Sequence, residues 1–217
     1  MSEQTKTVFL SYCHKETELA DHIGYFFSSM VGVTVSRDIR KVRYRDSFKD
    51  YMKGVREHDY VVMLISDNFL KSQACMFEVG EILTDEEFKK KLLFIVVSDD
   101  DAKHLKSRPE KPIGAKIYSP MERMNYIKHW EDQYEQFKTG FDEIKSDSAK
   151  VELTQQLREI RKIIDIDLGK FLDYIGDAYG RTFDQMYKTE FADIRFAMGI
   201  AEETYYKQEG ENGGTKQ

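Results

Sequence analysis

Short apolar runs alternate with amphipathic segments along the first half of the chain. Runs rich in β-branched and aromatic residues, each of strand length, occur at residues 7–12, 31–35, 60–66 and 92–97. In the intervening segments apolar side chains recur every three or four positions, which predicts helices over residues 16–30, 46–55 and 73–83. Strands that alternate with helices predict an α/β fold with a parallel sheet and right-handed crossovers.

The run at residues 60–66 is apolar at almost every position, as expected for a parallel strand with helices on both of its faces. The pattern weakens after residue 97, and the segment around Pro109 and Pro112 is typical of an irregular surface loop. We expect residues 116–119 to form a last, short edge strand.

Helical spacing of apolar residues returns in the second half, at residues 127–144, 153–179 and 183–198. We therefore expect one domain over residues 5–180, made of an α/β core at about 5–120 and closing helices at about 121–180. An additional C-terminal helix is expected over residues 181–207. The glycine-containing end, residues 208–217, is expected to be a flexible tail.

Composition narrows the class of protein. The 217 residues are 41% hydrophobic, enough for a substantial core, and carry a formal net charge of −6. An acidic chain is poorly suited to binding a nucleic-acid backbone. Its two cysteines exclude a disulfide scaffold, and no stretch approaches the roughly 20 apolar residues of a membrane helix. We expect a soluble, cytoplasmic protein that binds neither nucleic acid nor membrane.

Ligands of open parallel sheets bind beyond the carboxyl ends of the strands. Residues 11–15, Ser-Tyr-Cys-His-Lys, follow the first strand without a glycine, so the dinucleotide fingerprint is missing, and the sequence has no P-loop. A phosphorylated receiver domain would need an acidic pair where Ser11 and Tyr12 stand, and Asp67 alone does not supply it. The histidines show no metal-ligand spacing, so we predict no metal site.

Three separated motifs carry a resemblance to a known family. Residues 8–12 read Val-Phe-Leu-Ser-Tyr, Asp38 ends the second strand before a basic loop at 39–46, and residues 66–78 contain Ser-x-x-Cys-x-x-Glu. In order and spacing they resemble the Toll/interleukin-1 receptor (TIR) domain, which implies a flavodoxin-like three-layer fold with a C-terminal helical extension. The chain departs from the family in having Ala74 where Trp is common before the Cys. It also has Arg43 and its neighbours where the loop often has Gly.

The resemblance implies an activity. Enzymatic TIR domains cleave the bond between nicotinamide and ribose in NAD+, which is then the substrate, and no separate cofactor is needed. Cationic nicotinamide leaves without a general acid, and a carboxylate can stabilise the oxocarbenium-like charge that develops on the ribose. Glu78 matches the family's catalytic Glu, and the alternative for it is an ordinary solvated helix carboxylate. Glu81, one turn further, is by default structural.

The resemblance also suggests substrate-binding residues. Some of them have a competing interpretation. Tyr12 and Phe48 could simply pack on the sheet, and Cys75 could be a small buried hydrophobic residue. The basic residues, Arg43 among them, could form a solvated charged loop. The residues that we assign to substrate binding are Tyr12, Asp38, Arg43, Phe48 and Cys75.

Several functions are compatible with such a chain. The first is an NAD+ glycohydrolase or ADP-ribosyl cyclase resembling stand-alone prokaryotic members in antiphage defence. It would self-associate through TIR–TIR contacts, and its product would act on a downstream effector. The second is a non-catalytic adaptor that works through homotypic TIR–TIR contacts. We rank a host-directed effector last, because no secretion signal is visible.

Overall fold

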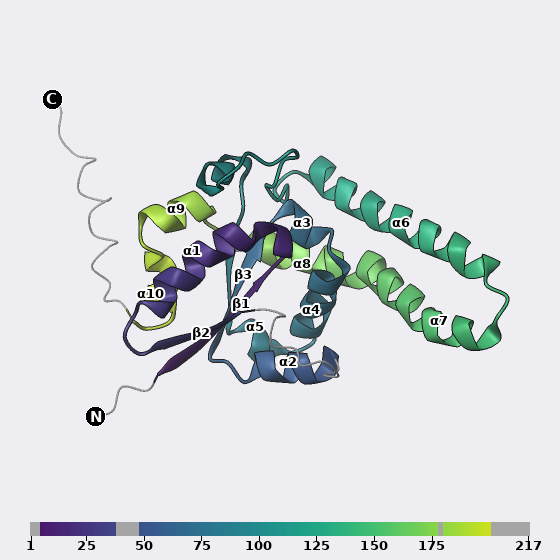
Figure 1. Cartoon of the computed structure of the whole chain (residues 1–217), viewed down its shortest axis with the longest axis horizontal. Coiled ribbons are helices and arrows are strands. Elements are labelled where there is room, and N and C mark those ends of the chain that lie inside the picture. The colour runs from purple at the N-terminus through teal and green to yellow at the C-terminus, as the bar shows by residue number, and fades with distance from the viewer. Residues whose placement is uncertain (1–4, 38–47, 178–179, 201–217) are drawn as a thin grey trace.

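The computed structural model describes residues 5–37, 48–177 and 180–200, except for the side chains of residues 48–51 and 152. At its centre is a parallel sheet of four strands in the order β2-β1-β3-β4 (Figure 1). This architecture is the α/β, flavodoxin-like arrangement predicted from the sequence. The strands are β1 (Lys6–Tyr12), β2 (Val33–Arg37), β3 (Tyr60–Ile65) and β4 (Leu92–Val96).

The helices of the first half connect these strands, and those of the second half follow the sheet. The α-helices are α1 (Thr17–Ser28), α2 (Phe48–Arg56), α3 (Asp67–Leu70), α4 (Gln73–Leu83), α5 (Glu86–Lys89), α6 (Pro120–Glu143), α7 (Asp147–Lys162), α8 (Leu168–Asp177), α9 (Phe183–Lys188) and α10 (Ala192–Ala197). The other helical turns are the 3₁₀ turns η1 (His14–Glu16) and η2 (Asp99–His104) and the π-helical turn η3 (Ile163–Asp167). The helices predicted at residues 16–30, 46–55 and 73–83 are confirmed as α1, α2 and α4.

Side chains of the sheet alternate between two hydrophobic clusters. On one face, Phe9 and Met63 pack with α2, α4, α6 and α8. On the other face, Leu10 and Leu64 pack with α1, α9 and α10. Because both faces are covered, the central strand β3 is buried over almost its whole length, as its continuous apolar run predicted.

The predicted edge strand at residues 116–119 is wrong. The backbone N–H of Lys116 donates instead to the hydroxyl of Tyr126 in α6, at 2.9 Å, and Arg123 donates to the carbonyl of Ile117. Side chains of α6 therefore satisfy the backbone groups that an edge strand would use. The outer edge of β4 is occupied from much later in the chain, where Thr182 forms a parallel bridge with Val96.

The expected single helix over residues 181–207 is also wrong in its described part, which forms the short helices α9 and α10. Glu190 and Phe191 separate them and adopt left-handed backbone conformations, with φ of 51° and 53°. The N–H of Phe191 donates to the carbonyl of Met186 at 2.7 Å, and its ring is buried against Phe27 of α1. Packing of this aromatic ring thus holds the turn that interrupts the helical pattern.

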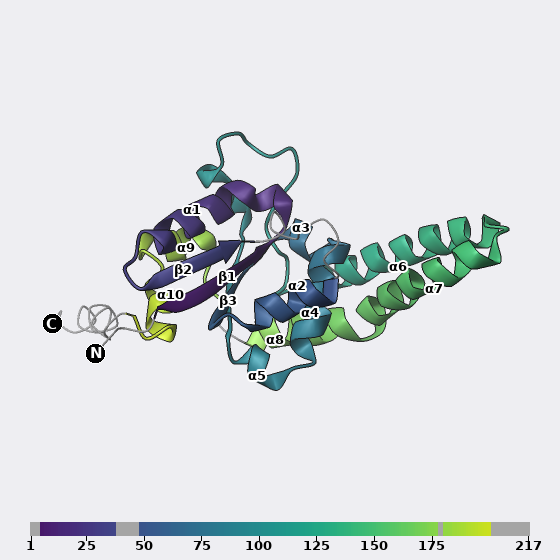
Figure 2. The same ribbon diagram turned by 60° about the horizontal axis from the view of Figure 1, so that its bottom comes forward.

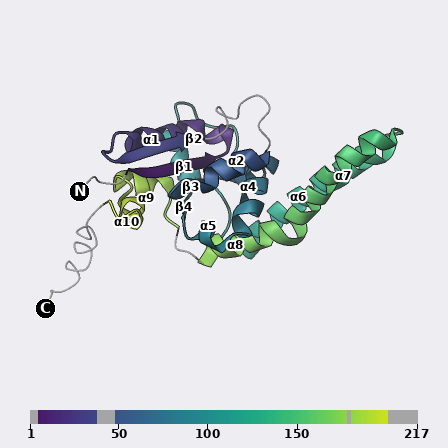
Figure 3. The same ribbon diagram turned by 90° about the horizontal axis from the view of Figure 1, so that it is seen from below.

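Helices α6 and α7 form an antiparallel hairpin that projects from the α/β body (Figure 2). The view from below shows the same projection, with α8 leading back to the sheet (Figure 3). At the base of the hairpin, Trp130 is buried and its indole N–H donates to the carbonyl of Leu70 at 3.0 Å. Among the described helices, none is long and apolar enough to cross a membrane.

Candidate functional site

The helix that carries Glu78 begins in a defined way. Ser66 follows β3 and accepts a hydrogen bond from the N–H of Phe69, which starts the single turn of α3. Ser72 then accepts from the N–H of Cys75 at 3.4 Å and caps α4. These two serines belong to the motif that the sequence singled out. Their structural role is to turn the chain from the end of β3 onto the sheet face beside β1.

Glu78 points from α4 into the protein and meets the end of β1. Its side chain is buried, with 6% of the residue exposed, and its Oε2 accepts a hydrogen bond of 2.7 Å from the hydroxyl of Ser11. Ser11 lies on the same sheet face as Phe9, two residues earlier. A buried carboxylate without compensating interactions is costly, so this contact fixes where the Glu78 carboxylate sits. The solvated helix carboxylate considered for Glu78 does not describe this position.

Two thiols lie next to this pair. Cys75 is one helical turn before Glu78, and Cys13 is two residues after Ser11, so both belong to the same side of the β1–α4 interface. The neighbouring Cys75 thiol lowers the pKa of Cys13, whereas the proximity of Cys13 and burial raise the pKa of Cys75. Cys75 therefore lies beside the candidate catalytic carboxylate, and its assignment to substrate binding stays a prediction.

A second buried carboxylate lies at this end of the sheet. Glu16 follows β1, is 1% exposed, and its Oε1 accepts a hydrogen bond of 2.7 Å from Asn68. Asn68 in turn accepts from the ammonium of Lys15 at 3.1 Å. Burial raises the pKa of Glu16, and hydrogen bonds from Asn68, Ser66 and Cys13 offset only part of that effect. This network joins the segments that follow β1 and β3.

The opposite side of α4 is held by the closing helices. Gly80 has no space for a side chain, because a Cβ atom there would lie 2.7 Å from Oδ2 of Asp167. Asp167 belongs to η3, is buried, and pairs with Lys162 at 3.2 Å. Burial raises the pKa of Asp167, and Lys162 partly opposes the rise. The helix bearing Glu78 is thus confined between β1 and η3.

The remaining predicted site residues are not brought together with Glu78. Tyr12 packs in the hydrophobic cluster on the other face of the sheet, with α1. Asp38 and Arg43 lie outside the described residues, and Phe48 begins α2 with its side chain outside them. Their assignment to substrate binding stays a prediction. Arg37, at the start of the basic segment, pairs with Asp21 of α1.

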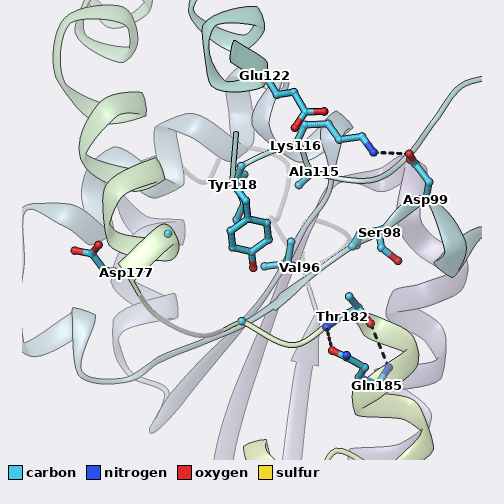
Figure 4. Close-up of a pocket in the computed structure, with 14 residues that line it drawn as sticks. Val96, Ser98, Asp99, Ala115, Lys116, Tyr118, Glu122, Asp177, Thr182 and Gln185 are labelled. Atoms are coloured by element: carbon cyan, nitrogen blue, oxygen red, sulfur yellow. Dashed lines mark hydrogen bonds and ion pairs between the residues drawn. The ribbon is translucent and has the colours of Figure 1, made fainter. Parts of the chain in front are cut away.

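A separate cavity of about 660 Å³ lies at the carboxyl end of β4. Its apolar lining includes Val96 and Ala115. Figure 4 shows polar contacts at its margin, where Lys116 pairs with Asp99 at 2.5 Å and Thr182 and Gln185 exchange hydrogen bonds. The cavity has the size of a small-molecule site, but its residues are not those of the sequence motifs.

Ser11, Cys13 and Glu16 lie at or beside the candidate site and were not assigned to it from the sequence. The available signal was alternation, since Ser11 interrupts the apolar residues on one face of a buried strand. Among the described residues, no group of three metal-ligating side chains comes together. What the site offers chemically is a buried, hydrogen-bonded carboxylate at the carboxyl end of the sheet, with a second carboxylate and two thiols nearby.

Comparison with known proteins places the chain in a family. The profile of the TIR domain matches residues 8–144, which is more than half of the chain. The protein belongs to the TIR domain family. A search of the curated proteins found no match.

Proposed function

We propose that this TIR protein is an NAD+ glycohydrolase that breaks the bond between nicotinamide and ribose, with Glu78 as the catalytic carboxylate. The observation that carries the proposal is the 2.7 Å hydrogen bond that holds the buried carboxylate of Glu78 against Ser11. A carboxylate that served only as surface charge would be exposed, as Glu81 is one turn further along α4.

The chemistry needs little more than such a carboxylate. Nicotinamide carries a positive charge in NAD+ and leaves as a neutral molecule, so no acid has to protonate it. Positive charge then builds up on the ribose, and a fixed anion in a water-poor site stabilises it strongly. Ser11 would hold the carboxylate in place before the reaction, which lowers the cost of reorganisation during it.

Several parts of the proposal concern the wider setting. The product would be ADP-ribose or a cyclic form of it, and a downstream effector would respond to that product. We place the activity in the cytoplasm and in antiphage signalling. Self-association through TIR–TIR contacts would complete the site, and Arg43 and its basic neighbours would meet either the substrate or the adjoining subunit.

The alternative is an adaptor that acts only through TIR–TIR contacts. The projecting α6–α7 hairpin favours it, because it adds surface to the α/β body without contributing to the Glu78 site (Figure 2). An adaptor would form complexes through this surface and would leave NAD+ unchanged, whatever residue stood at position 78.

Two matched substitutions on one helix test the proposal. Glu78→Gln removes the buried charge and keeps the side-chain size, whereas Glu81→Gln makes the same change at a side chain that is 46% exposed and pairs with Arg56 at 3.4 Å. Nicotinamide release and the second product are followed by mass spectrometry at high protein concentration, to allow assembly. We expect Glu78→Gln to lose at least about 100-fold in rate and Glu81→Gln to stay within about twofold of wild type. Equal release by wild type and Glu78→Gln rules out the assignment of Glu78.

A further inference from the structure

The chain leaves the neighbouring strands β1 and β3 toward opposite faces of the sheet. After β1 it continues into α1, which packs on the face of Leu10. After β3 it continues into α3 and α4, which pack on the face of Phe9. In open α/β sheets, ligands bind outside the carboxyl ends of two strands whose connections separate in this way. Side chains that gather at the ends of β1 and β3 are therefore candidates for ligand contacts.

Three side chains form a hydrogen-bonded network between these two strand ends. Asn68 in α3 donates from Nδ2 to Oε1 of Glu16 at 2.7 Å and accepts at Oδ1 from the ammonium of Lys15 at 3.1 Å. An ammonium group only donates, so the amide oxygen of Asn68 has to face Lys15 and the amide nitrogen has to face Glu16. The turn that carries Asn68 is itself fixed, because the N–H of Phe69 donates to the hydroxyl of Ser66 at 2.9 Å. The network therefore holds the Lys15 ammonium at the end of the sheet.

None of the carboxylates nearby cancels the charge of Lys15. Glu16 is 1% exposed, its Oε1 faces Asn68, and its Oε2 makes no hydrogen bond within the described chain. A buried carboxyl oxygen without a donor suits a bound proton, and burial raises the pKa of Glu16. Asp67, the residue before Asn68, pairs with Lys71 at 2.8 Å. Among the residues that the structure describes, Lys15 forms no ion pair, and a neutral amide holds its ammonium.

This arrangement suits an anionic ligand. The chain as a whole carries a net charge of −6, which repels anions, so a local unpaired cation decides where an anion can approach. Phosphate oxygens are strong acceptors for a lysine ammonium, which binds them as a point charge. Lys15 is exposed, so a ligand can reach its ammonium without disturbing the buried part of the network.

We propose that Lys15 binds the pyrophosphate of a nucleotide ligand, and that Asn68 and Glu16 position it for that contact. The choice of ligand rests on the proposed NAD+ cleavage, because NAD+ and ADP-ribose both carry a pyrophosphate. In NAD+ the pyrophosphate is the neighbour of the ribose that Glu78 would face. Ser11, the hydrogen-bond partner of Glu78, precedes Lys15 by four residues (15 − 11) on the same strand end.

Isothermal titration calorimetry on the full-length protein, at high concentration, tests the site without catalysis. The probes are ADP-ribose, which has a pyrophosphate and no nicotinamide to lose, inorganic pyrophosphate, and adenosine, which has no phosphate. We expect ADP-ribose to bind more tightly than pyrophosphate and to bind more weakly as salt is added, because salt screens an exposed ion pair. Adenosine binding should not depend on salt.

Substitution of the lysine should act only on ligands with phosphate. Lys15→Met should raise the Kd for ADP-ribose at least about fivefold and reduce its salt dependence, and Lys15→Arg should retain most of the affinity. Lys90→Met is the matched control, because Lys90 already pairs with Glu87 at 2.6 Å and precedes β4, at the opposite end of the strands. Its Kd should stay within about twofold of wild type.

A double substitution separates positioning from general stability. Asn68→Ala should raise the Kd for ADP-ribose less than Lys15→Met does, and the two changes together should be no worse than Lys15→Met alone. Glu16→Gln keeps a neutral side chain whose oxygen can accept from Asn68, so it should leave the Kd within about twofold of wild type. Additive losses from Lys15→Met and Asn68→Ala would contradict the positioning role.

Four results overturn the proposed site. These are an unchanged Kd for ADP-ribose in Lys15→Met, an equal loss of adenosine binding in that variant, pyrophosphate binding as tight as that of ADP-ribose, and no binding of either phosphate compound. Nicotinamide release from NAD+ is measured on the same proteins. ADP-ribose binding that depends on Lys15, with no nicotinamide release by wild type, refutes the proposed function and leaves the site standing. Release by wild type with the same KM in Lys15→Met refutes the site and leaves the function standing.

Discussion

The hydroxyl of Ser11, near the end of β1, donates a hydrogen bond of 2.7 Å to Oε2 of Glu78 in the second turn of α4. Both residues are buried, and 67 positions separate them in the sequence. The pair ties the one helix that carries the candidate catalytic carboxylate to a central strand of the sheet. Its removal should therefore affect the position of Glu78 more than the fold as a whole.

Ser11→Ala removes the donor and leaves the carboxylate in place. We expect kcat for nicotinamide release to fall by about 10- to 100-fold with a smaller change in KM, because Ser11 positions Glu78 and is not predicted to contact substrate. The stability loss should be about 1–3 kcal/mol, since a buried acceptor loses a partner. Ser29→Ala is the control, because it removes an exposed hydroxyl that donates to the Phe26 carbonyl at the end of α1. A rate for Ser11→Ala within twofold of wild type would contradict the positioning role.

Gly80→Ala tests the contact that holds the other side of α4. Alanine favours a helix over glycine by about 1 kcal/mol, but here its Cβ would lie 2.7 Å from Oδ2 of buried Asp167. We expect a net destabilisation of about 1–3 kcal/mol, measured by urea unfolding. Gly140→Ala in α6 is the matched control, since apart from its own helix backbone nothing lies within 4 Å of its Cβ and the helix propensity should stabilise the protein. Equal stabilisation by both changes would show that α4 is not confined by η3.

The buried carboxylate of Glu16 predicts a pH dependence of stability. Its pKa is raised by burial, so the folded protein binds its proton more tightly than the unfolded chain does. The contribution of Glu16 to the free energy of unfolding is therefore greatest below the pKa that Glu16 has in the unfolded chain. It declines as the pH rises through the higher pKa that Glu16 has in the folded protein. Glu16→Gln has no such titration, so its stability relative to wild type should improve as pH increases from about 4.3 upward. Urea unfolding of both proteins across this range measures the difference, and parallel curves would contradict it.

The strands and the main helices were predictable because each has its own periodicity. The apolar run at residues 60–66 and the helix at residues 73–83 are found almost at their predicted bounds. The failures occurred where a side-chain contact with another element overrides the local pattern. Tyr126 takes the N–H of Lys116, which prevents the expected edge strand, and Phe191 breaks the last helix by packing on α1.

The candidate site was predictable to the same limited degree. The motif pointed to Glu78 and Cys75, and the structure brings both to the β1–α4 interface. It could not point to Ser11 or Cys13 as their partners, because that pairing depends on how α4 crosses β1. Tyr12 follows Ser11 directly, yet the alternation of a strand sends it to the other face of the sheet.

The bridge between Val96 and Thr182 has a consequence for synthesis of the protein. All four strands have been synthesised once residue 97 is made, but the segment that covers the outer edge of β4 comes more than 80 residues later (182 − 97 = 85). Until then, the outer edge of β4 lacks this cover on the nascent chain. The sheet can therefore complete this edge only after the whole α6–α7 hairpin has been made.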